Sequence, residues 1–218
     1  MRLTFVFLSC LLIASCDKAA LTHDPETARL QAERGDPQAQ FQLGLSLLER
    51  AQASIDEAEA FTWIQRSAEQ GYAPAQYRLG LMYEEGQAVP VNQTQATHWY
   101  VLAAKQGDVD AQYSAGRMFY SGTGDYEADA EQAADWFEKS ANHGHGPAQR
   151  MLAEMYFAGT GVPQSYFYTF VWLTIAGSGR DSNSPMMNTS VQRMSEEQIL
   201  EARKFSEELS KRIERETS

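Results

Sequence analysis

Two histidines form the pattern in this chain that comes closest to a metal site. His143 and His145 stand in the segment NHGHGP, and a His-x-His pair on a loop can supply two imidazole ligands to zinc. No third ligand follows at a suitable spacing, and the segment coincides with a turn between two predicted helices. We therefore expect no metal ion and no cofactor. His98, beside Trp99, is interpreted as a surface or packing residue.

Serine and carboxylate chemistry are the other possibilities for catalysis. The one Ser-x-x-Lys match, Ser15 to Lys18, straddles a predicted cleavage site, and neither G-x-S-x-G nor K-T-G occurs. The segments ASIDEAEA and SEEQILEARK are rich in carboxylates, but their pattern is typical of solvated helix faces. The sequence therefore predicts no catalytic residue and a protein that is not an enzyme. A cell-envelope hydrolase using carboxylates or the two histidines is the alternative.

The first sixteen residues, MRLTFVFLSCLLIASC, predict a signal peptide over 1–15 that is removed from the mature protein. Arg2 precedes an apolar run over residues 5–14, which is shorter than the ~20 residues that a membrane-spanning helix needs and is typical of a signal peptide. The residues IASC at 13–16 resemble the bacterial lipobox. That resemblance implies cleavage after Ser15 and lipid attachment to Cys16. The alternative is an ordinary signal peptide followed by a chance cysteine.

Cysteine content and charge restrict the compartment and the partners. Cys10 would leave with the signal peptide and Cys16 would carry lipid, so the folded part would have neither a disulfide nor a free thiol. The formal net charge is −11 with no basic stripe, so we expect no nucleic-acid partner. These features predict a lipid-anchored membrane protein of the bacterial cell envelope that faces the periplasm. They do not distinguish the inner from the outer membrane.

Several residue types recur with a single period. The four tryptophans, Trp63, Trp99, Trp136 and Trp172, are 36 or 37 residues apart. Glycines and Ala-Gln pairs keep the same spacing, at Gly35, Gly71, Gly107 and Gly144 and at Ala39-Gln40, Ala75-Gln76, Ala111-Gln112 and Ala148-Gln149. A period of this length predicts structural repeats that stack on their neighbours.

Each period divides into two amphipathic helical halves. The first half carries a column of small residues, which predicts a close approach of two helices: Gly44, Gly80, Gly116 and Ala153. The second half begins at residues favoured as N-caps, namely Asp56, Asn92, Asp129 and Ser165. The loops between halves hold GTG at 122–124 and 159–161. We interpret these glycines as turn residues with positive φ, because no Gly-Lys-Ser/Thr phosphate-loop motif accompanies them.

These residues resemble the Sel1-like repeat, a relative of the tetratricopeptide repeat. Its pattern is A-x-x-x-L-G-x-x-Y-x-x-G-x-G-V followed by D-x-x-x-A-x-x-W-Y-x-x-A-A-x-x-G. The third unit matches through Ala111, Gly116, Phe119, Gly122, Gly124, Asp129, Ala133, Trp136, Phe137 and Ala141. The first unit departs from the pattern, because LLERAQASI lacks the loop glycines. The resemblance implies an all-α fold, a right-handed α/α solenoid of helix hairpins. A cysteine-rich branch of the family carries β-lactamase or penicillin-binding labels, but this chain lacks its repeated cysteine pairs.

The same pattern predicts the domain boundaries. They are a signal peptide over 1–15, a tether over 16–23, a solenoid over 24–179, a loop or degenerate helix over 180–194 and a capping helix over 195–215. Within the solenoid we expect an orphan capping helix over 24–34 and repeats over about 36–71, 72–107, 108–144 and 145–179. The segment SEEQ at 195–198 predicts a capping box.

The predicted binding surface follows from the resemblance, because first helices line the concave side of tetratricopeptide arrays. Counting from the small-residue column, we expect a partner-binding groove formed by Phe41, Leu45, Tyr77, Leu81, Tyr113, Arg117, Tyr120, Arg150, Glu154 and Phe157. Aromatic residues and arginine are enriched in binding hot spots. The leading hypothesis is a non-catalytic, membrane-tethered module that binds an envelope protein or peptide. The alternatives are a β-lactamase-like or peptidoglycan-related hydrolase, and a scaffold whose aromatic residues only pack between repeats.

Overall fold

The computed structural model describes residues 25–50, 54–177 and 184–217, and every regular element in these ranges is a helix. The predicted all-α fold is therefore confirmed. The signal peptide, the tether with Cys16 and residues 51–53 lie outside the described ranges. The helices are α1 (Pro25–Glu33), α2 (Pro37–Arg50), α3 (Ser54–Glu69), α4 (Ala73–Glu85), α5 (Gln93–Lys105), α6 (Val109–Ser121), α7 (Ala130–Asn142), α8 (Gly146–Ala158), α9 (Tyr166–Ile175), α10 (Pro185–Arg193) and α11 (Glu196–Glu216).

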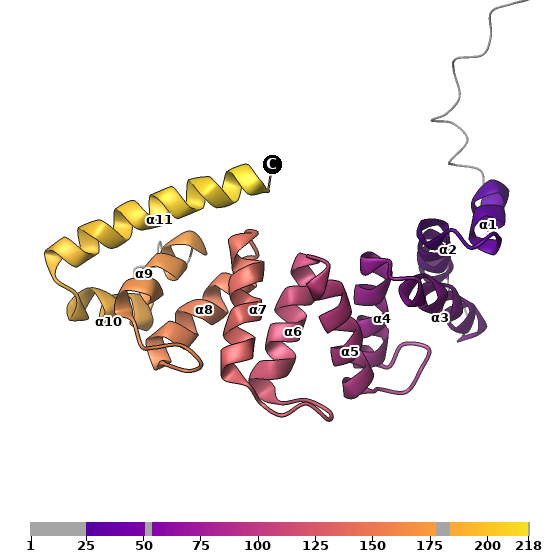
Figure 1. Cartoon of the computed structure of the whole chain (residues 1–218), viewed down its shortest axis with the longest axis horizontal. Helices are drawn as coiled ribbons and strands as arrows, with labels where there is room; N and C mark the ends of the chain where they lie inside the picture. Colours follow the sequence, from indigo (N-terminus) through magenta and orange to yellow (C-terminus); the bar gives the residue numbers. More distant parts are fainter. Residues whose placement is uncertain (1–24, 51–53, 178–183, 218) are drawn as a thin grey trace, which may run out of the picture.

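Four helix hairpins stack side by side along the chain (Figure 1). The hairpins are α2–α3, α4–α5, α6–α7 and α8–α9, and each second helix also packs on the first helix of the next hairpin. This arrangement buries the apolar faces because each hairpin covers what its neighbour exposes. Trp63, Trp136 and Trp172 are buried, and Trp99 is half-buried.

The small-residue column lets the two helices of each hairpin approach closely, as predicted. In the third unit, a Cβ added at Gly116 would lie 2.7 Å from the ring of Phe137. A Cβ at Gly80 would lie 2.6 Å from the ring of Tyr100. Both rings are fully buried, and both follow directly after a repeat tryptophan. The glycines therefore leave the space that these rings fill.

A row of buried glutamines joins consecutive hairpins. The side-chain amides of Gln40, Gln76, Gln112 and Gln149 donate to the main-chain carbonyls of Ala32, Ala68, Ala104 and Ala141 over 3.1, 3.1, 3.3 and 3.1 Å. These carbonyls lie near the C-terminal ends of the preceding helices, where backbone acceptors lack a partner within the helix. The recurring Ala-Gln pair therefore places a buried polar group that ties each hairpin to the one before it.

Within the described residues, this row is interrupted at the third unit. Gln70 donates to the side-chain oxygen of Gln40, and Gln106 donates to that of Gln76, each over 2.7 Å. One period later the chain has His143 in place of a glutamine, and its Nδ1 atom bonds to the carbonyl of Lys139 instead. The buried Oε1 atom of Gln112 consequently has no hydrogen-bond partner among the described residues.

Three of the four predicted N-caps are confirmed. The side chains of Asn92, Asp129 and Ser165 each accept a hydrogen bond from a backbone N–H in the first turn of the following helix. The prediction for Asp56 is wrong, because α3 begins at Ser54 and Asp56 lies inside its first turn. A carboxylate at that place still interacts favourably with the positive end of the helix dipole, so the residue type alone does not identify the cap.

The loop glycines adopt positive φ, as the turn interpretation predicted. Gly122, Gly124, Gly159 and Gly161 have φ between 64° and 72°. Gly161 also touches the preceding hairpin, since an added Cβ would lie 2.1 Å from the carbonyl oxygen of Ala130. In the other loop, an added Cβ at Gly124 would lie 2.7 Å from the backbone nitrogen of Thr94. Both loops therefore need glycine for their backbone conformation and for a close approach to a neighbouring hairpin.

The second unit breaks this rule at one residue, Ala88. It stands where Gly124 and Gly161 stand in the later units, and it has φ of 63° although it carries a Cβ. An L-residue in this region of φ/ψ space is strained by roughly 1–2 kcal/mol. The second unit thus keeps the turn geometry of the family pattern without its glycine.

Replacing Ala88 with glycine is expected to raise the free energy of unfolding by about 0.5–1 kcal/mol, because release of this strain exceeds the loss of one partly buried methyl group. Urea denaturation followed by circular dichroism measures the change. As a control, Ala58→Gly on the exposed face of α3 should lower stability by about 1 kcal/mol. A loss of stability in Ala88→Gly would contradict the assignment of strain.

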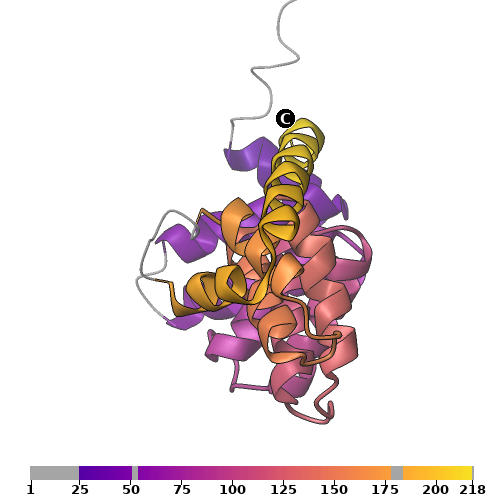
Figure 2. The ribbon, with the colours of Figure 1, turned by 90° about the vertical axis from the view of Figure 1, so that its left-hand side faces the viewer.

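Helices at both ends cover the array. Helix α1 packs on α2, and α10 and α11 pack on α9. Helix α10 falls in the region for which the sequence predicted a loop or degenerate helix. The predicted capping box is present, with Ser195 and Gln198 bonding reciprocally at the start of α11. Helix α11 then runs back toward the turn between α7 and α8, where the side chain of Ile213 lies next to Gly144 (Figures 1 and 2).

Candidate functional site

The ten residues predicted to bind a partner all lie on α2, α4, α6 and α8, which form a surface that we call the first-helix face. Four of them are exposed: Arg117, Tyr120, Arg150 and Glu154. The other six are half-buried: Phe41, Leu45, Tyr77, Leu81, Tyr113 and Phe157. The exposed members therefore come from the third and fourth units.

The half-buried aromatic residues pack against the hairpins while keeping part of their surface accessible. The ring centroid of Tyr77 lies 5.7 Å from that of Tyr100, and that of Tyr113 lies 5.7 Å from that of Phe137. Phe41 contacts Tyr72 of the next unit edge-on at 5.6 Å. These rings therefore contribute to packing, and removing one would disturb the fold as well as the surface.

A cleft of about 550 Å³ opens on the first-helix face between the second and fourth units. It brings together the predicted residues Tyr113, Arg117 and Tyr120. Further lining residues come from α4, α5, α6, the loop after α6, and α8: Glu84, Gln93, Met118, Ser121, Thr123 and Met151. The sequence analysis did not predict Gln93, Thr123 and Met151. They belong to a second helix, a loop and a neighbouring unit, whereas the prediction used the spacing within first helices.

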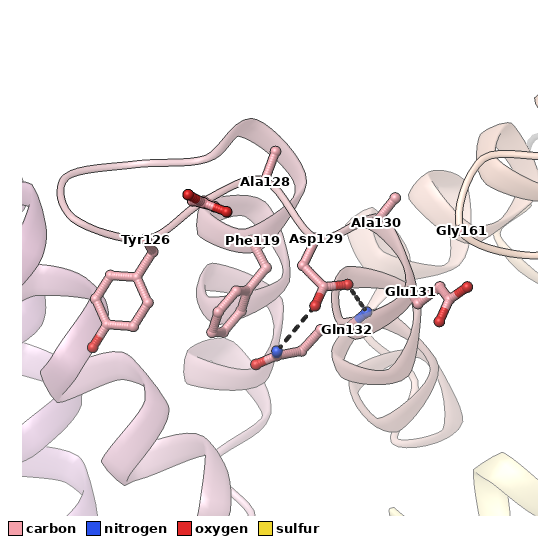
Figure 3. Close-up of a pocket in the computed structure, with 9 residues that line it drawn as sticks. Phe119, Tyr126, Ala128, Asp129, Ala130, Glu131, Gln132 and Gly161 are labelled. Carbon is pink, nitrogen blue, oxygen red and sulfur yellow. Dashed lines mark hydrogen bonds between the residues drawn. The ribbon is translucent and has the colours of Figure 1, made fainter.

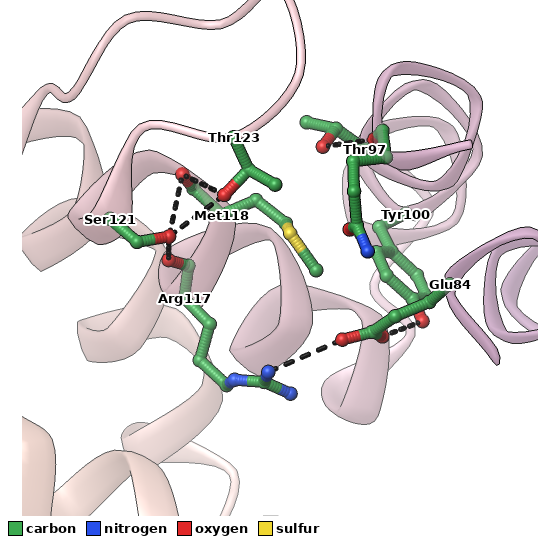
Figure 4. A network of polar contacts seen from close by, with 8 residues as sticks. Glu84, Thr97, Tyr100, Arg117, Met118, Ser121 and Thr123 are labelled. Carbon is green, nitrogen blue, oxygen red and sulfur yellow. Dashed lines mark hydrogen bonds and ion pairs between the residues drawn. The ribbon is translucent and has the colours of Figure 1, made fainter. Parts of the chain in front are cut away.

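An ordered polar network fixes one wall of the cleft (Figure 4). The Nη2 atom of Arg117 lies 3.2 Å from Oε1 of Glu84, and the hydroxyl of Tyr100 donates to Oε2 of the same carboxylate over 2.5 Å. Burial, followed by the hydrogen bond and the negative charge of Glu84, raises the pKa of Tyr100 far above its ordinary value. The phenol therefore remains a donor at every physiological pH.

His145 has a structural role at the joint between the third and fourth units. Its Nδ1 atom accepts the backbone N–H of Ala148 and so caps α8, while its ring stacks on Tyr113 at 4.6 Å. Its Nε2 atom lies 3.4 Å from Oδ1 of Asp110. Burial lowers the pKa of His145, and Asp110 opposes this shift. In the part of the chain that the structure describes, no three His, Cys, Asp or Glu side chains are placed to hold a metal ion.

A second cavity, of about 480 Å³, lies beside the loop between α6 and α7 (Figure 3). Its lining includes Glu127, Asp129 and Glu131. The carboxylate of Asp129 is engaged at the start of α7, where it accepts from both the backbone and the side-chain nitrogen of Gln132. We therefore regard this cavity as part of the loop architecture.

None of the helices in the described ranges has the length and hydropathy needed to cross a membrane.

Comparisons with known proteins agree with this geometry. The profile of the Sel1 repeat matches four consecutive segments, residues 37–72, 73–108, 109–145 and 146–181. The structure of a Sel1 repeat protein from Oxalobacter formigenes is similar, with a TM-score of 0.65, 26% identity, and coverage of 72% of this chain and 65% of that one. No curated protein matches the sequence.

A second similar structure is that of c5321, a protective antigen present in uropathogenic Escherichia coli strains, which displays an SLR fold. Its TM-score is 0.52 with 27% identity, and the match covers 88% of this chain and 49% of that one. The chain therefore spans less than two thirds of either relative. Sel1 repeats generally mediate protein–protein interactions. Because the four matched segments are contiguous and coincide with the four stacked hairpins, this chain belongs to the Sel1 repeat family.

Proposed function

We propose that this protein is a non-catalytic interaction module, tethered to a bacterial membrane, that binds an envelope protein or peptide on its first-helix face. The cleft is the observation that supports this assignment of the binding site. It combines the exposed side chains of Arg117 and Tyr120 with the half-buried Tyr113 and Met151 in a single hollow. Tyrosine, arginine and methionine are enriched at protein interfaces.

The tether is proposed from the sequence, because residues 1–24 lie outside the described ranges. An apolar signal followed by IASC at 13–16 supports lipid attachment to Cys16. Several acyl chains hold a protein stably on a membrane, whereas a single chain does so only marginally. Labelled palmitate should enter the wild-type protein and be lost in Cys16→Ser. Equal labelling of both proteins would contradict the anchor.

The binding site is tested with a cleft variant that carries Arg117→Gln and Tyr120→Ser. Crosslinking in the native host and mass spectrometry should recover a partner with the wild type and lose it with the cleft variant. The variant should keep its helicity and melting temperature, since both residues are exposed and substitutions at such positions usually change stability by less than about 0.5 kcal/mol.

A matched control changes two exposed residues on a second helix, Asp135→Asn and Glu138→Gln of α7. This control variant should recover the partner as the wild type does. Retention of the partner by the cleft variant, or its loss from the α7 control alone, would place the interaction on another face.

A further inference from the structure

The geometry of the cleft points to the chemistry of its ligand, and this inference rests on the proposed function. We infer that the cleft binds a peptide segment through an acidic side chain, with Arg117 receiving the carboxylate and Tyr113, Tyr120 and Met151 contacting an adjacent apolar side chain. Two features of the cleft support this assignment: the hydrogen-bonding groups that remain free in it, and its balance of charge.

Arg117 has unused donors. Its guanidinium carries five N–H groups, and only Nη2 has a partner, Glu84, within the described ranges. Its side chain is 47% exposed at the edge of the cleft (Figure 4). A planar guanidinium with a free edge is suited to two parallel hydrogen bonds with a carboxylate.

Glu84, in contrast, has little capacity left for a ligand. Oε1 faces Arg117, Oε2 accepts from Tyr100, and the side chain is only 20% exposed. Its carboxylate therefore orients the guanidinium of Arg117 and does not attract a basic ligand. The cleft thus offers donors, and a complementary ligand must bring acceptors.

The balance of charge favours a carboxylate over a phosphate. The lining contains one cation, Arg117, and one anion, Glu84, within hydrogen-bonding distance of each other. A ligand with a single negative charge can share the guanidinium with Glu84. A phosphate group carries about −1.5 to −2 charges at neutral pH, so its repulsion from Glu84 would be greater.

The position of the cleft indicates that the bound carboxylate belongs to a side chain of the peptide and not to its C-terminus. It lies in the middle of the array, and accessible aromatic residues continue on both sides, Tyr77 on α4 and Phe157 on α8. A peptide that follows the first-helix face would therefore pass through the cleft. Its acidic residue would lie within the segment and not at its end.

The test begins with random peptides displayed on phage and selected on the purified full-length protein. A selected peptide is synthesised in two forms, with Asp or Glu and with the matching Asn or Gln. Calorimetry should show that the amide form binds the wild type about tenfold more weakly, since a charged hydrogen-bonded pair is lost. With Arg117→Gln the two forms should bind within about threefold of each other.

Arg203→Gln is the matched control, because it removes an exposed arginine from α11 and should keep the tenfold preference. Selected peptides that bind acidic and amide forms equally, or that keep their preference with Arg117→Gln, would overturn this inference and leave the proposed function intact. Tighter binding of a phosphoserine form would overturn the carboxylate assignment alone. Failure to select any peptide would count against the proposed function as well.

Discussion

Replacing Gly116 with alanine is expected to lower the free energy of unfolding by about 2 kcal/mol. The added Cβ would lie 2.7 Å from two ring carbons of Phe137, whose side chain is fully buried and cannot move aside freely. Overpacking of this kind costs roughly 1–3 kcal/mol or more, and the better helix propensity of alanine returns up to about 1 kcal/mol. Urea denaturation followed by circular dichroism measures the difference.

The protein supplies both a control and a rescue for this change. Gly146→Ala makes the same substitution in α8, where the new Cβ would meet only the tip of Arg150 at 3.7 Å, so stability should change little. The fourth unit combines Ala153 with Leu173, the residue after its tryptophan. The double variant Gly116→Ala/Phe137→Leu should therefore lose about 1 kcal/mol less than the sum of its single changes. Strict additivity would contradict the steric explanation.

Replacing Gln76 with leucine is expected to lower the free energy of unfolding by about 2 kcal/mol, because two hydrogen bonds are lost. The amide of Gln76 donates to the carbonyl of Ala68 and accepts from Gln106, and its side chain is 5% exposed. Leucine keeps much of the volume but removes one of the two donors to the carbonyl of Ala68, which then accepts only from the backbone N–H of Gly71, and the loss of such a bond costs roughly 0.5–1.5 kcal/mol. The loss of the bond to Gln106 adds to this cost. Thermal and urea denaturation both report it.

Gln112 provides the matched comparison. Gln112→Leu breaks the bond to Ala104 but also removes an oxygen that already lacks a partner, so its cost should be about 1 kcal/mol smaller than that of Gln76→Leu. His143→Gln should supply the missing donor and stabilise the protein by about 1 kcal/mol. In that background the cost of Gln112→Leu should rise to that of Gln76→Leu. Equal costs in the original background would show that the interruption of the glutamine row has no energetic effect.

Much of the fold could be predicted because its determinants are local and repeated. The spacing of the tryptophans by 36 or 37 residues and the small-residue column each describe a contact that recurs in every unit, and the loop glycines recur in the third and fourth units. The prediction that Asp56 is an N-cap failed where this repetition is incomplete. The first unit lacks the loop glycines, so its sequence contains no turn signal that locates the start of its second helix.

The candidate site could be predicted only in part. Tyr113, Arg117 and Tyr120 share one helix, so helical spacing was enough to place them on one face. Gln93, Thr123 and Met151 join them in the cleft from other elements. Their positions depend on how one hairpin is rotated and shifted against the next, and no spacing within a single helix encodes that relation.

The sequence by itself determined the class of fold, the number of hairpins matched by the family profile and the helices on which the predicted groove residues lie. It did so because each repeat carries its own apolar pattern, glycines and buried glutamine. Tertiary structure alone decided that Glu84 is held between Tyr100 and Arg117, and that the Oε1 atom of Gln112 has no donor among the described residues. These outcomes arise where side chains of different units meet, and their free energies depend on distances of a few ångströms that only the packed hairpins define.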